Sequence, residues 1–506
     1  MYISLLEEIY NFLVEKIGMP DLNTRTENVN LVPLSNIDYR DKIRGAMVNL
    51  AIGDAFGSSW EGQQSKEIEH INHFLKGERS TASLKGTWQT TTVILFAESL
   101  IINQTFNPED LANRFIRQPI IGIDKVMEQF TLNYRDHRME WYRCGIASVE
   151  AGAAIRGVPL ALINYGDFTT LKLIGGIQTI ITHMDETAVA ASILFSSAVA
   201  YLLNTPAFSM QSKNDFNLFI DTLCKSIKGI ETKVYPTGKN GEIANLYIMV
   251  NRILKEWIDK SISIEEIKEQ WGSSANSLEA IPLSLYIFLK NPNDYEKTLK
   301  ECLTMRETDI IVTMVLALLG AYLGFNNIPK GYINKLYMDK EILTLSDRLF
   351  ELSLKNKSNN PYRRMRDQIE IERSQDELDK LLWLGIKYNK EEEYAMSIKY
   401  FEELITKSPD FKKNERVKLH IIEAYEGLGS KLLDNEAYED ALRCFKKALI
   451  YDLNHPTILC DIAVTYLNID DLDKAEKYAR RAVEIAPEYE IGREVLEGIK
   501  SLQNKS

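Results

Sequence analysis

Four acidic residues carry most of the chemistry that this sequence could support, namely Asp54, Glu61, Glu307 and Asp309. Two or three carboxylates that face one cavity suffice for general acid and base work on a glycosidic bond. The sequence contains no GxSxG turn, no phosphate-binding loop and no HExxH helix, so the common motifs of other hydrolases are missing. Any catalysis would therefore depend on these carboxylates.

Each of these acids also has a purely structural interpretation. Asp54 lies in the apolar helical pattern AIGDAFG, where a buried carboxylate is costly unless it is paired, so it serves either a helix-to-helix hydrogen bond or a pocket. Glu61 in the turn-like SSWEG is either a solvated loop residue or a ligand. Asp309 opens an apolar helix and could be its cap or a first-turn acid. His183 and Asp185 in THMDE are typical of the N-terminal cap of a following helix.

Several short motifs occur in a fixed order along the first two thirds of the chain. They are AIGDAFGSSWEG (51–62), AESL (97–100), GAAIRGVPL (152–160), THMDETA (182–188) and ETD followed by GAYLG (307–324). In this order and spacing they resemble the ADP-ribosylglycohydrolase family, whose pattern reads roughly GDxxGxxxE, TDDT, GNGxAMRxxP, THxD and GGDTDT before GAYYG.

The resemblance implies an all-helical domain in which two Mg²⁺ ions hold the ribose of ADP-ribose while an N- or O-glycosidic bond is hydrolysed. Mg²⁺ requires oxygen ligands, mainly carboxylates and waters, and two ions need several carboxylates to offset their charge. Carried over residue by residue, the resemblance gives three metal candidates, Thr87, Glu307 and Asp309. Mg²⁺ is accordingly the cofactor that the family implies.

This chain departs from the family pattern at three metal-ligand positions. Counted back from AESL, the segment Thr87-Trp88-Gln89-Thr90 falls on TDDT, so Trp88 and Gln89 stand where the family has aspartates. Ile310 stands where the last motif ends in threonine. A register shifted by two residues changes nothing, because no acid occurs between Arg79 and Ala97. An indole in place of a carboxylate would fill the space of the first ion.

The rest of the implied pocket matches only in part. Glu150-Ala151 replaces the glycine and asparagine that precede Gly152, and a carboxylate there would repel a diphosphate. Met305-Arg306 replaces paired glycines; Arg306 either forms a phosphate-binding fork or pairs with Glu307 or Glu301. The ligand-binding residues that the resemblance implies are Asp54, Trp88, Gln89, Gly152, Arg156, His183 and Arg306.

Long helical patterns must position these residues. The apolar and small residues of 43–55, 91–102, 186–203 and 309–323 predict closely packed helices, and β-signals are sparse, so the fold class is all-α. We expect an N-terminal helix and connector over residues 1–40, the ADP-ribosylglycohydrolase-like domain over 41–354 and a charged linker over 355–380.

The last region, 381–506, contains a repeat. The pattern Tyr438, Ala441, Phe445 and Ala448 recurs 34 residues later at Leu472, Ala475, Ala479 and Ala482, which is the tetratricopeptide (TPR) period. An earlier copy with Tyr394, Ser397, Phe401 and Leu404 lies 44 residues before the second, and segment 414–434 is long enough to hold the excess. A helical solenoid of TPR-like repeats is predicted, with a non-repeating helical bundle as the alternative.

Composition narrows the function classes. The chain has 506 residues, a net charge of -12 and no low-complexity tract, which favours a globular protein and argues against a nucleic-acid-binding surface. Five scattered cysteines without a CxxC pair fit a reducing, cytoplasmic location and no structural zinc. The acidic N-terminal segment is not a signal peptide, and no segment reaches the roughly 20 apolar residues of a membrane span, so no membrane partner is expected.

Two functional hypotheses follow. In the first, the domain has lost its two-metal chemistry and acts as a pseudoenzyme that binds ADP-ribose or a related nucleotide-sugar ligand, while the TPR repeats recruit a protein or peptide partner. In the second, a remodelled, metal-poor site remains a hydrolase, with Glu61 and Asp309 as the catalytic candidates. A third possibility is that the repeats carry the function and the large domain supports them.

Overall fold

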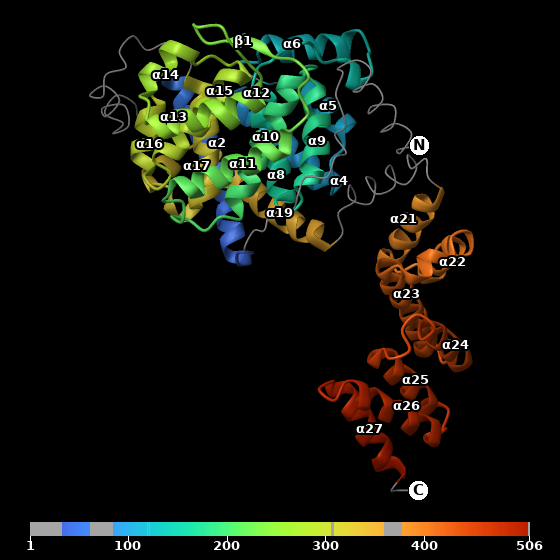
Figure 1. Cartoon of the computed structure of the whole chain (residues 1–506). Helices are drawn as coiled ribbons and strands as arrows, with labels where there is room; N and C mark the ends of the chain where they lie inside the picture. Colours follow the sequence, from blue (N-terminus) through green and yellow to red (C-terminus); the bar gives the residue numbers. More distant parts are fainter. Residues whose placement is uncertain are drawn as a thin grey trace. The chain divides into compact units, whose positions relative to one another are not determined.

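The computed structural model describes residues 33–60, 84–118, 120, 122–304, 308–358 and 377–503. The chain splits into two compact units, Met1–Arg364 and Met365–Ser506, which are described separately (Figure 1). The regular structure of the described residues is almost entirely helical, apart from one antiparallel pair of three-residue strands, β1 (Tyr235–Thr237) and β2 (Glu242–Ala244). The all-α class expected from the sequence is therefore confirmed.

The first unit contains helices of very different length. They are α2 (Asn36–Trp60), α4 (Trp88–Asn103), α5 (Pro108–Arg117), α6 (Lys125–Thr131), α7 (Gly152–Arg156), α8 (Val158–Asn164), α9 (Phe168–Ile180), α10 (Glu186–Leu203), α11 (Lys213–Ile227), α12 (Leu246–Ile248), α13 (Lys255–Lys260), α14 (Ile264–Trp271), α15 (Ser277–Lys290), α16 (Tyr295–Cys302), α17 (Thr308–Leu323), α18 (Lys330–Ile333) and α19 (Asp339–Ser358). Short π and 3-10 turns are η2 (Leu132–Asp136), η3 (Trp141–Arg143), η4 (Met249–Leu254) and η5 (Phe325–Asn327).

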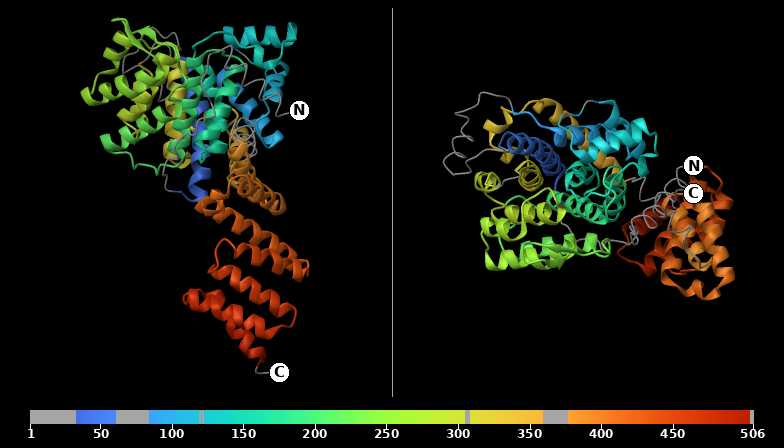
Figure 2. Two further views of the ribbon diagram at one scale, coloured as in Figure 1. Left: turned by 45° about the vertical axis from the view of Figure 1, so that its right-hand side comes forward. Right: turned by 90° about the horizontal axis from the view of Figure 1, so that it is seen from above.

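Helices α2 and α17 form the centre of this unit and run side by side (Figure 2). Glycines allow the backbones to touch: a Cβ atom added to Gly45 would lie 2.4 Å from the Gly320 carbonyl oxygen, and one added to Gly57 would lie 2.4 Å from the Asp309 Cα atom. No larger side chain fits such a contact without moving a helix. The pair therefore fixes Asp54 on α2 and Asp309 on α17 relative to each other.

Helix α10 is buried along its whole length. It has the length and apolar composition of a membrane span, yet every one of its 18 residues is buried inside the folded unit. Asp185 caps its N-terminus by accepting a 2.8 Å hydrogen bond from the Thr187 backbone amide, as the THMDE pattern predicts. The helix thus belongs to the core of the domain.

Lys42 on α2 is a charged residue buried in this core, with 3% of its surface exposed. Its ammonium donates to the carbonyl oxygens of Leu202 (3.0 Å), Ala321 (3.1 Å) and Tyr322. These carbonyls belong to the last turns of α10 and α17, where the helix dipole favours a cation. Burial lowers the pKa of Lys42 to about 7.

The second unit consists of paired helices and a last single helix (Figure 2). They are α21 (Glu377–Lys390), α22 (Tyr394–Lys407), the 3-10 turn η6 (Pro409–Lys413), α23 (Glu415–Asp434), α24 (Tyr438–Ala448), α25 (Pro456–Asn468), α26 (Leu472–Ile485) and α27 (Glu490–Gln503). Helix α23 has 20 residues against 13 for α25, and α22 has 14 against 11 for α24, which accounts for the longer spacing before the second repeat.

The predicted repeat positions form the core of this unit. Phe401 and Phe445 are fully buried, and Ala479 occupies the matching position of the last pair. A Cβ atom added to Gly385 would lie 2.7 Å from the Phe401 ring, and one added to Gly429 would lie 2.5 Å from the Phe445 ring. Small residues thus let the two helices of a pair cross closely, and each pair buries its apolar face against the next. This arrangement confirms the helical repeat architecture.

Candidate functional site

Asp54 joins α2 to the N-terminus of α4. Its Oδ2 atom accepts hydrogen bonds from the backbone amides of Thr87 (2.6 Å) and Thr90 (3.0 Å) and from the Thr90 hydroxyl (2.6 Å), while Oδ1 accepts from the Thr87 hydroxyl (2.6 Å). The carboxylate is 0% exposed. Free amides at a helix start are commonly satisfied by a side-chain oxygen, and here that oxygen comes from another helix. Of its two interpretations, the structure shows the helix-to-helix hydrogen bond.

Gln89 of α4 and Asp309 of α17 form a second contact at the same junction. Gln89 Nε2 donates a 2.9 Å hydrogen bond to Asp309 Oδ2, linking α4 to α17. Gln89 is 0% exposed, and its Oε1 atom is buried without a hydrogen-bond partner in the described structure. The amide therefore presents its N–H group to the carboxylate that the resemblance assigns to metal binding.

Trp88 lies beside this junction, against the start of α7. A Cβ atom added to Gly152 would lie 2.7 Å from Trp88 Cη2 and 3.8 Å from Asp124 Oδ2. Trp88 is partly exposed and lies where α4 and α7 begin. Gly152 is thus required for the present position of Trp88, which gives this glycine a steric role.

Arg156 and His183 are buried in the core of the domain. Arg156, 3% exposed, donates from Nε to Gln178 Oε1 (3.0 Å) and from Nη2 to the Gln178 carbonyl oxygen (2.8 Å), and its guanidinium lies 5.3 Å from the Phe115 ring centroid. Burial lowers its pKa to about 9. In this structure the guanidinium is held by Gln178, and the ligand-binding role that the resemblance implies for Arg156 stays a prediction.

His183 is 1% exposed, and its Nδ1 atom lies 2.8 Å from the Thr182 hydroxyl. Burial, followed by the charge of Arg156, lowers its pKa to about 3, so the imidazole is neutral at physiological pH. Its Nε2 atom is buried and has no hydrogen-bond partner in the part of the chain that the structure describes. The ligand-binding role that the resemblance implies for His183 stays a prediction.

The structure thus brings together only part of the predicted site. Asp54, Thr87, Gln89 and Asp309 form one junction, with Trp88 and Gly152 next to it, whereas Arg156 and His183 lie in the core. Glu61, Arg306 and Glu307 lie outside the described residues.

Two residues at the site were not anticipated from the sequence. Asp124 caps α6 by accepting a 2.7 Å hydrogen bond from the Met127 amide, and burial raises its pKa. Gln178 holds the Arg156 guanidinium. Gln178 could have been found, because it is a lone long polar residue in the apolar run LIGGIQTI, whereas nothing local distinguishes Asp124 from other helix caps.

The described residues do not fit the two Mg²⁺ ions that the resemblance implies. Asp54 already accepts four hydrogen bonds, the Thr87 hydroxyl donates to it, Gln89 offers an N–H group, and Trp88 has no oxygen. Ile310, at the final threonine position, is buried and apolar. Across the described ranges no three His, Cys, Asp or Glu side chains are grouped so that they could hold a metal ion.

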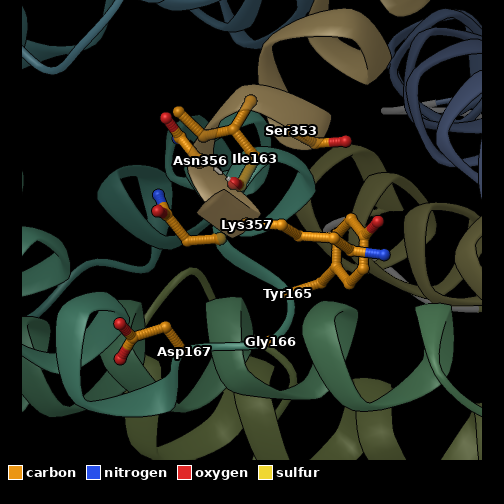
Figure 3. Close-up of a pocket in the computed structure, with 8 residues that line it drawn as sticks. Ile163, Tyr165, Gly166, Asp167, Ser353, Asn356 and Lys357 are labelled. Atoms are coloured by element: carbon orange, nitrogen blue, oxygen red, sulfur yellow. Dashed lines mark hydrogen bonds between the residues drawn. The ribbon is translucent and has the colours of Figure 1, made fainter. Parts of the chain in front are cut away.

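A separate cavity of about 120 Å³ lies between the end of α8 and the last turns of α19 (Figure 3). The Lys357 ammonium lies 4.4 Å from the Tyr39 ring centroid and 5.0 Å from that of Tyr165, and burial raises the pKa of Tyr165 to about 12. None of the predicted site residues lines this cavity. Its lining residues are Ile163, Asn164, Tyr165, Gly166, Asp167, Ser353, Asn356 and Lys357.

A large helical domain built around the α2–α17 pair, followed by stacked helical repeats, defines the class of this protein. Residues 35–359 match the ADP-ribosylglycohydrolase family, and residues 456–489 match the tetratricopeptide repeat. Because the first match covers more than half of the chain, this protein belongs to the ADP-ribosylglycohydrolase family.

Curated relatives align with the same part of the chain. An ADP-ribosylhydrolase ARH3 of Xenopus tropicalis is 26% identical over 323 residues, covering 58% of this chain and 89% of the relative. An uncharacterized protein of Archaeoglobus fulgidus is 25% identical, covering 62% and 98%. The ADP-ribosylarginine hydrolase Tri1 of Serratia proteamaculans is 20% identical, covering 65% and 85%.

Among solved structures, an ADP-ribosylglycohydrolase-related protein complex matches with a TM-score of 0.44 and 19% identity, covering 63% of this chain and 99% of the other. The P58(IPK) TPR domain matches with a TM-score of 0.20 and 14% identity, covering 82% and 98%.

Proposed function

We propose that the family domain binds an ADP-ribosyl group or a related nucleotide-sugar ligand without two-metal hydrolysis, and that the TPR repeats recruit a protein partner. The observation that carries this proposal is the side-chain set at the start of α4. The helix begins with Trp88 and Gln89, where the family pattern has two aspartates. Two divalent ions cannot be held without the carboxylates that offset their charge.

The frame around these positions supports binding as the remaining function. The α2–α17 pair is packed through glycine contacts, and Asp54 holds the N-terminus of α4 in place. The partly exposed indole of Trp88 offers a flat surface on which a base or sugar ring can pack, and Gly152 leaves room for it. A partly exposed indole beside few carboxylates favours binding over hydrolysis.

Calorimetric titration with ADP-ribose, in Mg²⁺ and separately in EDTA, tests the binding. We expect equal affinity in both buffers and weaker binding for Trp88→Ala, which removes the indole. Trp383→Phe in the repeat unit is the matched control and should bind like the wild type. Absence of ADP-ribose binding by the wild type in both buffers would refute the proposal.

Release of ADP-ribose from an ADP-ribosylated protein separates the binding module from the enzyme. We expect no release above background with Mg²⁺ or with EDTA. Release that survives EDTA and disappears in Asp309→Asn would instead identify the remodelled carboxylate enzyme. Mg²⁺-dependent release would identify a two-metal hydrolase.

The role of the repeats rests on their fold, because stacked helical repeats expose extended surfaces suited to protein partners. Affinity capture with the full chain can be compared with Gly429→Val, whose side chain would meet the Phe445 ring and disturb the stacking. Gly331→Val changes a glycine of the family domain that has open space around it, and is the control. A partner that the wild type and the control bind, but Gly429→Val loses, uses the repeats.

A further inference from the structure

We propose that the hydrogen bond between Gln89 and Asp309, together with the Asp54 cap, takes the place of a divalent cation at the junction of α2, α4 and α17. The domain is then assembled and kept ready for ligand without any such ion. This inference deepens the proposed function by making the site independent of metal. It rests on the proposed function only for the location of the ligand site. Its test measures stability and requires no ligand.

The first support is that Asp54 already accepts four hydrogen bonds. Its Oδ2 atom faces the backbone amides of Thr87 and Thr90 and the Thr90 hydroxyl and has no lone pair left, while Oδ1 faces the Thr87 hydroxyl. A cation at Oδ2 would have to displace at least one of these donors. Because the two amides begin α4, their loss would leave helix-terminal N–H groups unsatisfied inside the protein.

The second support is the orientation of the Gln89 amide. Its Nε2 atom lies 2.9 Å from Asp309 Oδ2, which assigns the N–H side of the amide to the carboxylate. The opposite orientation would place two oxygens against each other. An N–H group repels a cation, so the face of Asp309 that α4 covers is closed to a metal ion. Gln89 Oε1 alone adds no charge that would help to neutralise a divalent ion.

The third support is the direct packing of α2 against α17. The backbones of α2 and α17 are in contact at Asp309, where a Cβ atom on Gly57 would lie 2.4 Å from the Asp309 Cα atom. Ile310, the next residue, is buried. Backbone packing and hydrogen bonds between the described residues therefore hold this junction together.

A single isosteric substitution should reverse this replacement. Gln89→Glu keeps the shape of the side chain but places a second carboxylate against Asp309, and two adjacent carboxylates cannot both stay ionised without cost. A divalent cation between them would relieve the repulsion. Gln89→Leu is the control, because it removes the hydrogen bond without adding charge.

The experiment is thermal unfolding of the full-length protein in EDTA and at increasing MgCl₂ or MnCl₂, without nucleotide, with matched ionic strength. We expect the melting temperature of the wild type to be the same in EDTA and in MgCl₂. Gln89→Leu should melt a few degrees lower in both. Gln89→Glu should melt lower in EDTA and recover with MgCl₂ or MnCl₂, and Gln178→Glu, a buried glutamine beside Arg156, should show no such recovery.

A wild type that melts higher in MgCl₂ than in EDTA would overturn the inference, and so would Gln89→Leu melting like the wild type. Gln89→Glu that melts low and gains nothing from either cation would also contradict it, since the junction would then have no place for an ion to return. Failure of the proposed function would show separately, as loss of ADP-ribose binding with these melting results unchanged.

Discussion

Substitution of Asp54 tests whether this motif residue serves the fold. Asp54→Ala leaves two amides and two hydroxyls at the start of α4 without their acceptor in a fully buried place. A hydrogen bond to a charged group contributes roughly 1.5–3 kcal/mol, but four such bonds to one side chain are not additive. Removing one partner of a buried charged network costs about 3–5 kcal/mol, so we expect a loss near 4 kcal/mol.

Asp54→Asn should cost less, about 1–2 kcal/mol, because the amide oxygen can still accept both backbone N–H groups while its NH₂ group donates to a threonine hydroxyl. Asp185→Ala is a matched helix-cap control with a single amide partner, and should cost about 1 kcal/mol. The structure therefore predicts the largest loss of stability for Asp54→Ala and smaller losses for Asp54→Asn and Asp185→Ala.

Urea unfolding of the full chain, followed by tryptophan fluorescence, measures these losses. The signal reports mainly on the family domain, because Trp383 is the only tryptophan of the repeat unit. The protein should be measured in EDTA and in MgCl₂. A loss for Asp54→Ala below about 1 kcal/mol would refute the structural role of Asp54, since a true helix cap alone contributes that much. A loss seen only in MgCl₂ would refute it as well.

Three further predictions use the same unfolding measurement. Burial lowers the pKa of Lys42 in the folded protein from 10.5 to about 7. Between these pH values the unfolded chain therefore binds one proton more than the folded protein. The stability of the wild type relative to Lys42→Met should rise with pH in this window, by at most roughly 1.4 kcal/mol per pH unit. If the stability difference does not change with pH, this result would contradict the buried position of the Lys42 ammonium. A Cβ atom on Gly320 would lie 2.1 Å from the Gly45 carbonyl oxygen, so Gly320→Ala should cost about 3 kcal/mol or more, whereas Gly331→Ala, with open space, should be near neutral. Equal stability of these two variants would argue against the close α2–α17 contact. Burial opposes ionisation of Asp347, but the guanidinium groups of Arg40 and Arg44 outweigh it and hold the Asp347 pKa well below its usual range. The ion pairs are partly exposed, so Asp347→Asn should cost only about 1 kcal/mol at pH 7. This difference should decrease as the pH falls below 3.8 and disappear only below the lowered pKa of the folded state; a difference that stays constant throughout this decrease in pH would show that the charge is not its source.

The architecture could be predicted from the sequence because its signals are periodic. The patterns over 43–55, 91–102, 186–203 and 309–323 lie within α2, α4, α10 and α17, and α10 has the predicted bounds. The repeat was readable because Phe401 and Phe445 recur at equivalent positions beside small residues. Such patterns reflect burial, which many residues share, so the loss of any one of them would not hide the helix.

The site could be predicted only as a set of positions. Arg156 was expected at a ligand but packs on Phe115 and binds Gln178, and a single arginine in a motif does not show which way its side chain points. Gln89 was expected as a lost metal ligand, yet its bond to Asp309 depends on the crossing of α4 and α17, which no local pattern describes. Residue types thus indicate possible chemistry, and the packing decides which donors and acceptors remain available.

The two buried charges of α2, Lys42 and Asp54, both serve the fold. This explains why Asp54 matches the family pattern although the metal-ligand positions of this chain differ from it. Asp54 meets the N-terminal amides of α4, and Lys42, near the other end of α2, meets the C-terminal carbonyls of α10 and α17. Each charge has the sign that the helix dipole favours at that end, so both connect α2 to helices that pack around it. Neither needs an ion or a ligand to be stable in the core. The aspartate of the AIGDAFG motif is therefore explained by folding alone, and its presence is no argument that metal-dependent hydrolysis persists; that question depends on Gln89, Trp88 and Asp309.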